Sequence, residues 1–314
     1  MLAALGWIEI AAYANVARTM SHAAPIVSAA TRGGAQRRMD RENGAMPGVS
    51  QELLRFANTN RQPAAPGIEV IETPRYRIVL QPDFPVPGPN SVSWIRCRSE
   101  EAGALIDEVR SIVAPRHIPL MWTLDPDTEP VDFAGHLAAR GVHPDPRAPQ
   151  VAVMVLPIDV SLDPPDVGGL ELHDALADLD AFRKADSVNV EAFTSRQPVY
   201  DPGQVATLER RRRNQLAAGN RRVILATVDG EPAGSAGLSL FPPSGAIING
   251  GGVRAKFRGR GVYRAMVVAR LQMARAAGVA GITVWGANTS APILARLGFE
   301  TVGWRKFYLD ESTA

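Results

Sequence analysis

The sequence predicts a mixed α/β fold, in which helices flank a central sheet whose strands run both parallel and antiparallel. Two observations lead to this prediction. Short runs of β-branched and aromatic residues alternate irregularly with amphipathic helical segments, not in strict strand–helix order. The pair Asp229-Gly230 stands between two apolar runs, which is a strong signal for a tight hairpin. A purely helical fold and a purely parallel sheet are both excluded.

A boundary near residue 165 divides the chain into two halves. Its 314 residues suffice for about two domains. Of the 25 prolines, 19 lie in residues 1–165, and these residues carry 15 basic and 18 acidic side chains against 19 and 14 in the rest. The proline- and glycine-rich segment 163–169 reads as a linker. We expect an irregular leader with a short helix over 1–67, one domain over 68–162 and a second over 168–314.

The leader and the first domain follow from local patterns. Residues 1–20 are apolar, but Glu9 and Arg18 interrupt them and no basic residue precedes them, so we expect a short helix or an irregular leader and no secretory signal. The polar tract 21–50 is expected to be irregular. Strands and helices are then predicted from apolar runs and periodicity, with strands at 76–80, 91–97, 120–124 and 151–156, and helices at 100–113 and 132–140.

The second domain is expected to open with a strand at 170–172. Helices follow at about 175–193 and 203–218, the latter stopped by Gly219-Asn220. A long helix over 262–277 ends at Gly278, and a short one begins near Ser290, with Pro292 tolerated in its first turn. The remaining strands are predicted at 222–228, 233–240, 246–253, 282–285 and 301–308.

Composition excludes several classes of protein. The formal charge is only +2, which argues against a dedicated nucleic-acid binder. A single cysteine, Cys97, can build neither a disulfide framework nor a structural zinc site, and we expect no bound metal. No uncharged apolar run reaches the length of about 18 residues that spans a bilayer. We therefore expect a cytoplasmic protein that binds neither nucleic acid nor membrane.

The most informative segment is the junction at residues 253–263, where a strand ends and a helix begins. Gly259 and Gly261 lie one residue apart immediately before the predicted helix. Unpaired N–H groups at the positive end of a helix dipole bind anions, and glycine lets a phosphate approach closely. Lys256, Arg258 and Arg260 supply counter-charge. Taken alone, the segment also fits an ordinary glycine turn with solvated arginines.

Two other nucleotide-binding loops do not fit this junction. A P-loop needs the pattern Gly-x-x-x-x-Gly-Lys-Ser/Thr, which is absent from the sequence. A Rossmann fingerprint needs a third glycine at position 264, which is Arg264, and an acidic residue about 20 positions later, where 276–286 contain none.

The segment Arg258-Gly259-Arg260-Gly261-Val262-Tyr263 resembles the pyrophosphate loop of the GNAT superfamily of acetyl-CoA-dependent N-acetyltransferases. Downstream, residues 288–299 resemble the later motif of the same family, with Asn288 at its start and Gly298-Phe299 at its end. The two motifs lie about 30 residues apart with a predicted strand between them, as the family requires. The resemblance covers roughly residues 168–314.

Residues 70–157 resemble a second, degenerate copy of the same fold. Residues 132–142 are similar to the helix and Gly-Phe segment near the end of such a domain. Where the pyrophosphate loop belongs, the chain has Arg98-Ser99-Glu100-Glu101, so two carboxylates stand in place of two glycines. We expect one acetyl-CoA site, in the second half.

The resemblance implies how acetyl-CoA is held. The strands at 246–253 and 282–285 should separate, with pantetheine pairing to the backbone of Val253. The pyrophosphate should bind Gly259, Arg260, Gly261, Val262 and Tyr263 beside Arg258, while Asn288 reaches the coenzyme past the second strand. A backbone N–H near Gly251 or Gly252 would stabilise the oxyanion. The glycine run 250–252 fits either room for the thioester or a simple bulge.

The implied reaction is direct attack of an amine on the acetyl thioester, which favours a general base. Many relatives carry a carboxylate on the first separated strand, where this chain has only Asn249. Glu191 is the leading candidate for the base and His173 the second, with Asp201 and Glu209 left open. The tyrosine acid of many relatives is replaced by Leu294, and Tyr263 is not expected to act as the acid.

Three functions remain in competition at the level of sequence. The first is N-acetyl transfer to a small-molecule or peptide amine. The second is non-catalytic acyl-CoA binding or regulation, favoured by the missing tyrosine and strand carboxylate. The third is association with nucleic acid through Arg210–Arg213, although a solvated helix surface explains this run better. A homodimer is one option for the assembly.

Overall fold

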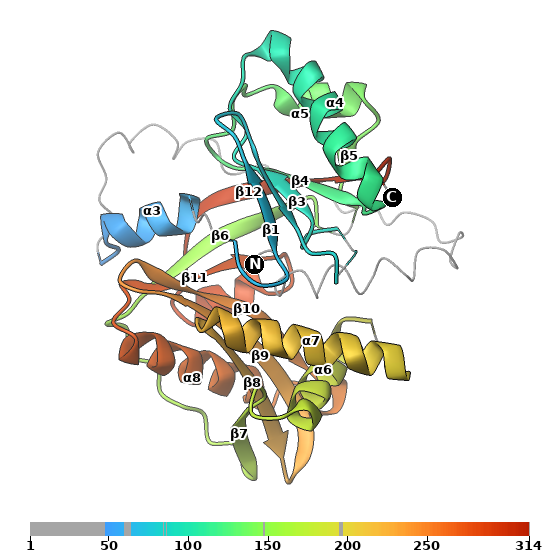
Figure 1. Cartoon of the computed structure of the whole chain (residues 1–314). Helices are drawn as coiled ribbons and strands as arrows, with labels where there is room; N and C mark the ends of the chain where they lie inside the picture. Colours follow the sequence, from blue (N-terminus) through green and yellow to red (C-terminus); the bar gives the residue numbers. More distant parts are fainter. Residues whose placement is uncertain are drawn as a thin grey trace, which may run out of the picture.

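A computed structural model describes residues 48–59, 64–83, 85, 87–146, 148–194 and 197–313. The expectations for residues 1–20 and for most of the tract 21–50 lie outside these described residues. A mixed sheet of 12 strands, flanked by helices on both faces, confirms the predicted fold class (Figure 1). None of the helices within the described ranges is long and apolar enough to cross a lipid bilayer.

The first half contributes six strands and three α-helices to the described part of the chain. In order, its elements are α3 (Gln51–Thr59), β1 (Glu69–Glu72), β2 (Arg77–Leu80), β3 (Ser91–Ser93), the 3₁₀ turn η2 (Ser99–Glu101), α4 (Ala102–Val113), the 3₁₀ turn η3 (Ala114–Arg116), β4 (Leu120–Leu124), α5 (Phe133–Ala139), β5 (His143–Pro144) and β6 (Gln150–Pro157). The strand predicted at 91–97 ends early, because Trp94 takes a left-handed backbone angle, φ 54°.

The second half follows its predicted order closely. Its elements are β7 (Leu170–Asp174), α6 (Leu179–Thr194), α7 (Pro202–Ala218), β8 (Arg221–Val228), β9 (Glu231–Phe241), β10 (Gly245–Val253), the 3₁₀ turn η4 (Ala255–Phe257), α8 (Val262–Ala276), β11 (Gly281–Gly286), α9 (Ala291–Arg296) and β12 (Glu300–Asp310). Asp229 and Gly230 both have positive φ, 52° and 76°, which is the geometry of the predicted hairpin turn.

The order of strands differs from two separate sheets placed side by side. It runs β1-β2-β3-β4-β12-β6-β11-β10-β9-β8-β7, with β5 paired to β12 outside this order, so the last strand of each half lies inside the sheet, next to the other half. β6 pairs antiparallel with β11, and β12 pairs antiparallel with β4. β6 and β12 pair with each other at the centre. The two halves therefore share one continuous sheet through exchanged strands.

Helices cover both faces of this sheet (Figure 1). In the second half, α8 and α9 pack on one face, where Met154, Ile248 and Ile282 are buried. α6 and α7 cover the opposite face, against Val223 and Leu225. In the first half, α4 and α5 pack over β2–β4. This layering places α6 and α7 on one side of β10 and α8 on the other.

Helix α3 was not predicted, and it covers the middle of the sheet. Leu53 and Ala57 are buried against Val153 and Val155 of β6. The guanidinium of Arg305, in β12, donates from Nη2 to the carbonyls of Ala57 at 3.1 Å and of Asn58 at 2.8 Å. Because Arg305 satisfies carbonyls left open at a helix C-terminus, it fixes α3 to the exchanged strands.

Candidate functional site

Strands β10 and β11 separate after a short paired stretch. Their parallel ladder consists of the pairs Ala246–Ile282 and Ile247–Thr283, although β10 continues to Val253 and β11 to Gly286. Where two neighbouring strands diverge, their facing N–H and C=O groups are open to an extended ligand, which can pair with them as an added strand would. The strands that separate are the two that the sequence resemblance selected.

A β-bulge lies on β10 where the two strands have parted. The register to β9 shifts between Asn249 and Gly252, and Gly250 has φ 58°. We call Gly250–Gly251 the glycine bulge. A Cβ added to Gly251 would lie 2.7 Å from Cε2 of Tyr263, so the tyrosine ring packs directly on this glycine. The run thus contains a bulge, which is one of the two sequence interpretations, and the ring of Tyr263 fills the space beside Gly251; room for the thioester stays a prediction.

Beneath the bulge lies a buried arginine that the sequence analysis missed. Arg270, in α8, is fully buried and donates from Nη1 to the carbonyls of Gly250 at 3.2 Å and Gly237 at 3.3 Å. Its Nε donates to the carbonyl of Met266 at 3.0 Å. The signal in the sequence was its position, because Arg270 lies four residues after Met266 and four before Ala274 on the buried face of the helix.

Residues 258–263, here called the glycine loop, form the predicted junction between β10 and α8. Gly259 and Gly261 both take left-handed angles, φ 77° and 89°, and Gly261 is the N-cap of α8 without a side-chain cap. The N–H groups in the first turn of an α-helix have no acceptor within the helix, and here no capping side chain serves them. The loop therefore lies at the positive end of a 15-residue helix, whose first-turn N–H groups have no acceptor within the helix.

The basic residues of the junction have different partners. Arg258 donates from Nε to the carbonyl of Val253 at 3.1 Å and from Nη2 to that of Ala192 at 3.1 Å, so it ties the loop to β10 and α6. Lys256 pairs with Glu231. The guanidinium carbon of Arg260 lies 5.5 Å from the ring centre of Phe257, and its side chain is exposed. Arg260 is therefore the cation of this junction best placed to meet a phosphate.

The linker passes directly beside the glycine loop. A Cβ at Gly261 would lie 3.1 Å from Cβ of Pro165 and 3.1 Å from Cγ2 of Val167. Arg264 and Arg275 of α8 donate to the linker carbonyls of Asp163 at 3.2 Å and Ile158 at 2.8 Å. These contacts hold the segment that connects the two halves against helix α8.

The candidate bases lie in different places. Glu191, near the end of α6, faces Arg254, which follows β10 directly, with Oε2 3.0 Å from Nε. Neither of these two atoms makes a hydrogen bond with good geometry among the described residues, so the contact is an ion pair. Asp201 caps α7 by accepting from the N–H of Gln204 at 2.8 Å, and Glu209 pairs with Arg212.

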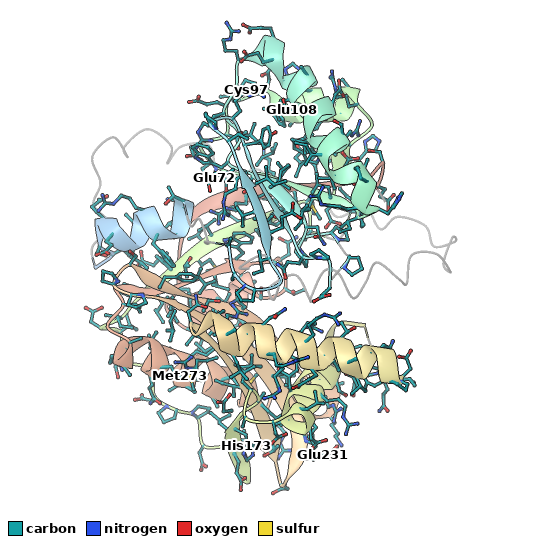
Figure 2. All side chains as sticks on the ribbon, in the orientation of Figure 1. Glu72, Cys97, Glu108, His173, Glu231 and Met273 are labelled. Carbon is teal, nitrogen blue, oxygen red and sulfur yellow. The ribbon has the colours of Figure 1, made fainter. Side chains whose placement is uncertain are left out.

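His173 lies apart from the other predicted site residues. It is on β7, at the outer edge of the sheet, and β8 and β9 separate it from β10. Its Nε2 is 3.0 Å from Oγ1 of Thr227 and 3.4 Å from Oε2 of Glu171 (Figure 2). The structure thus brings Glu191, Val253, the glycine bulge and the glycine loop to one end of β10, without His173.

The later motif has two features that matter for the site. Asn288 is exposed in the turn between β11 and α9. Leu294, at the position of the tyrosine acid in many relatives, is completely buried in the core that α8 and α9 share. No hydroxyl is available at this point of α9.

The equivalent junction in the first half is closed by its own carboxylate. Within the described residues, the parallel strands β3 and β4 pair at only two positions, as β10 and β11 do. The 3₁₀ turn η2 then leads directly into helix α4. Glu101 accepts from the backbone N–H of Arg98 at 3.0 Å and from its Nη2 at 2.9 Å. The side-chain and then the backbone hydrogen bond from Arg98 lower the pKa of Glu101 to about 2. An anionic side chain therefore lies where a phosphate would bind.

Part of the chain matches a family model, and its fold is similar to solved structures. Residues 189–299 match the model described as the acetyltransferase (GNAT) family. A GCN5-related N-acetyltransferase from Kribbella flavida is similar in structure, with a TM-score of 0.60, 16% identity, and coverage of 82% of this chain and 95% of that one. A tandem GNAT protein from the clavulanic acid biosynthesis pathway, solved without acetyl-CoA, is also similar, with a TM-score of 0.54 and 18% identity. The match covers 97% of this chain and 93% of that protein. The comparison with curated proteins found no match.

Proposed function

We propose, on the premise that residues 189–299 form an acetyltransferase domain of the GNAT family, that the chain transfers the acetyl group of acetyl-CoA to a primary amine. The family and the shared fold support acyl transfer in general. The amine acceptor and direct attack are our proposal. Two features found together carry the proposal. Strands β10 and β11 separate after two residue pairs, and helix α8, which follows β10 in the chain, begins at Gly261 without a side-chain cap.

The residues around β10 suit each part of acetyl-CoA. Past its last pair with β11, the backbone of β10 near Val253 can pair with an extended, amide-containing arm in the manner of an added strand, where the carbonyl of Val253 also accepts from Arg258. The first-turn N–H groups of α8 and the guanidinium of Arg260 can bind a diphosphate. Asn288, exposed past the end of β11, is a further proposed contact. When bound, acetyl-CoA supplies a thioester, whose acetyl carbon is already activated for attack.

The chain's own groups would then act on the acceptor and on developing charge. The acceptor ammonium first loses one proton to the base; the neutral amine nitrogen then bonds to the acetyl carbon, the carbon–sulfur bond breaks, and the second proton of the nitrogen goes to the leaving thiolate, giving the amide and free thiol. The N–H groups of the glycine bulge are the donors we propose for the oxyanion. Glu191 stays our first candidate for the proton acceptor because it lies at the end of β10, although its carboxylate is paired with Arg254.

The test compares two glycine substitutions that differ only in their place. Gly259 and Gly219 both have positive φ, 77° and 71°, and at both an added Cβ would meet no atom within 4 Å. Gly259→Asp puts a carboxylate into the glycine loop, whereas Gly219→Asp puts one at the end of α7. We expect G259D to weaken acetyl-CoA binding at least tenfold by calorimetry, and G219D to leave it within twofold, because only the first introduces like charge beside a phosphate.

The same preparation separates the alternatives. Release of free thiol with a panel of amines supports transfer. Binding of acetyl-CoA without thiol release would favour the non-catalytic acyl-CoA-binding alternative. Equal affinity of G259D and wild type would contradict the assignment of the glycine loop.

A further inference from the structure

Arg221, the first residue of β8, is a buried cation outside the coenzyme-binding features described above. Its side chain is almost fully buried, with 1% of the residue exposed. Nη1 contacts the hydroxyl of Ser239, but Nε and Nη2 have no hydrogen-bond partner among the described residues. Desolvation lowers the pKa of Arg221 to about 9. Burying a guanidinium with most of its donors unpaired is costly, so this arrangement calls for a partner.

The two open donors of Arg221 are on one edge of the guanidinium. Among the described residues, the same edge, Nε with Nη2, binds a carboxylate at four other arginines, of which Arg140 with Asp107 and Arg212 with Glu209 are two. Arg110 uses it on Asp310, at 2.8 and 3.1 Å, and Arg210 uses it on Asp83, at 2.7 and 2.8 Å. This paired geometry matches the two oxygens of a carboxylate. No carboxylate of the described residues forms an ion pair with Arg221.

Polar side chains connect Arg221 to the glycine bulge. In the sheet register Arg221 lies opposite Ser239, and Ser239 opposite Ile247. Asn249, two residues further along β10, donates from Nδ2 to the same Ser239 hydroxyl at 2.8 Å, and both polar side chains are buried. The row Arg221–Ser239–Asn249 thus crosses three neighbouring strands, spaced about 4.8 Å apart. It ends at the residue directly before the bulge.

The row lies on the face of the sheet that α6 and α7 cover. Val223 and Leu225, on the same side of β8 as Arg221, pack against those helices, whereas α8 with Arg270 is on the other face. From α7, Gln215 is also buried, and its Oε1 has no hydrogen-bond partner within the described chain. A second unsatisfied polar atom on the covering helix is the kind of group that orients a polar ligand.

We propose that Arg221 binds a carboxylate of the acceptor, so that the acceptor is a small amino acid with its amine and its carboxylate in one molecule. This inference rests on the proposed function. The amine lies toward the glycine bulge and the carboxylate toward Arg221, one to two strand spacings away. A polyamine would bring a second positive charge to a buried cation, and a peptide N-terminus would bring no carboxylate within reach. The proposal therefore narrows the acceptor to small amino acids.

The experiment uses the full-length chain with acetyl-CoA and pairs of acceptors that differ in one group. Each amino acid of a panel, with α-, β- and ω-amino members, is compared with its carboxamide and with the amine that lacks the carboxylate. Thiol release gives kcat/KM for each. We expect at least one acid to exceed its carboxamide by about 100-fold or more, because the carboxamide leaves the buried guanidinium unpaired. Acids, amides and plain amines used equally well would overturn the proposal.

Variants on the same strand provide the matched control. Arg221→Met should reduce the rate with the preferred acid to the level of its carboxamide, and leave the carboxamide rate unchanged. Arg222→Met removes the neighbouring arginine, which is exposed and donates to the backbone carbonyls of Gly219 and Arg221. R222M should keep the acid preference of the wild type. An R221M protein that keeps the preference would contradict the assignment.

Binding gives a second readout that does not need turnover. With CoA present, the preferred acid should raise the Tm of the wild type and not that of R221M, whereas its carboxamide should raise neither. If R221M does not fold, Arg221→Lys keeps the charge without the paired edge, and should lose most of the shift. If no acid of the panel raises the Tm of the wild type, the proposal is wrong. Failure of acetyl-CoA itself to bind identifies failure of the proposed function, whereas binding without acid preference refutes only the role of Arg221.

Discussion

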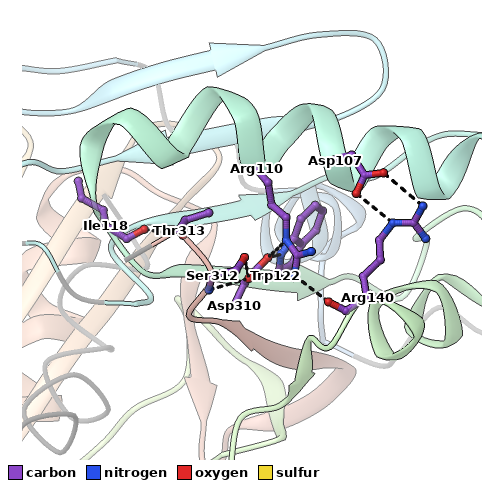
Figure 3. Close-up of polar contacts among 8 residues, drawn as sticks. All are labelled: Asp107, Arg110, Ile118, Trp122, Arg140, Asp310, Ser312 and Thr313. Carbon is purple, nitrogen blue, oxygen red and sulfur yellow. Dashed lines mark hydrogen bonds and ion pairs between the residues drawn. The ribbon is translucent and has the colours of Figure 1, made fainter.

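Asp310 joins the final strand of the chain to the first half. Its side chain is 1% exposed, and it accepts from Nε and Nη2 of Arg110 and from the indole N–H of Trp122 at 3.1 Å (Figure 3). Burial alone would raise the pKa of Asp310, but the hydrogen bonds from Arg110, Ser312 and Trp122 outweigh it and lower the pKa. A buried carboxylate with this many donors fixes β12 against β4 and α4.

Replacing this carboxylate should destabilise the fold in a pH-dependent way. Asp310→Asn keeps the shape but removes the charge facing Arg110, and we expect a loss of about 3 kcal/mol in the free energy of unfolding near pH 7. Because the folded pKa is lowered, the contribution of Asp310 is present above the unfolded value of about 4 and is lost as the pH falls through the folded pKa. Denaturant unfolding of both proteins from pH 7 to pH 3 measures this.

The control for Asp310 is an exposed acid in a comparable pair. Asp107, in α4, binds Arg140 at the surface, with 62% of its side chain exposed (Figure 3). Asp107→Asn should change the free energy of unfolding by less than about 1 kcal/mol. Equal effects of the two substitutions, or a D310N effect that grows below pH 4, would contradict this account.

At the scale of elements, helix α8 serves the site through its N-terminus and its buried face. Its N-terminus forms the glycine loop, and its buried Arg270 holds the carbonyl of Gly250 from below. A donor to this carbonyl fixes the orientation of the peptide groups in the bulge, including the N–H groups we propose for the oxyanion. Arg270 is thus a positioning residue.

Removing that donor should affect turnover more than coenzyme affinity. Arg270→Met replaces the buried arginine with an apolar side chain of similar length, a change that folded cores often tolerate. We expect kcat to fall about tenfold or more, because a bulge less firmly held misplaces its N–H groups. The KM for acetyl-CoA should change less than threefold, since the glycine loop is untouched.

Arg275→Met is the matched control, because Arg275 lies on the exposed side of the same helix and donates to the backbone carbonyls of Ile158 and Val160, away from the bulge. R275M should leave kcat within twofold. If R270M raised the KM for acetyl-CoA and left kcat unchanged, the positioning role would be wrong.

Elements were predictable where local chemistry specifies them. The Asp229-Gly230 turn needs positive φ at both residues, and the glycine loop needs two glycines before a helix, so both were visible in the sequence. Arg221 was not visible, because nothing local distinguishes it from the other arginines of this chain, whereas Arg270 was missed although its spacing places it on the buried face of α8. The early end of β3 at Trp94 was also missed, since its left-handed angle departs from the preference of a bulky residue.

At the scale of the whole molecule, the exchange of β6 and β12 joins the halves into one unit. The sequence predicted the strand at 151–156, and in the structure β6 is buried along nearly its whole length. The sequence could not indicate which strands lie beside β6, since pairing partners more than 100 residues apart leave no local pattern. The proposed domains 68–162 and 168–314 are thus continuous in sequence, but each completes its sheet with a strand from the other.

Cutting the chain at the linker should therefore prevent folding of either part alone. A fragment of residues 1–165 loses β12 beside β4 and leaves β6 without either neighbour, and residues 166–314 lose β6 beside β11. We expect each fragment to lack a cooperative thermal transition by circular dichroism when expressed alone.

The two fragments expressed together should form a complex with a single transition, because every strand then regains its partners. Independent cooperative unfolding of the separate fragments would show that the exchanged strands are not needed for folding.

The N-termini of α4 in the first half and α8 in the second half differ in whether a negatively charged group lies beside them. Glu101 supplies the negative charge at the start of the first, whereas the start of α8 at Gly261 has no side-chain cap. On the proposed function, acetyl-CoA is the missing anion, and an anion bound there adds stability in proportion to the logarithm of its concentration. The lifetime of this enzyme in a cell would then rise and fall with the supply of acetyl-CoA, and starvation for the donor would shorten it.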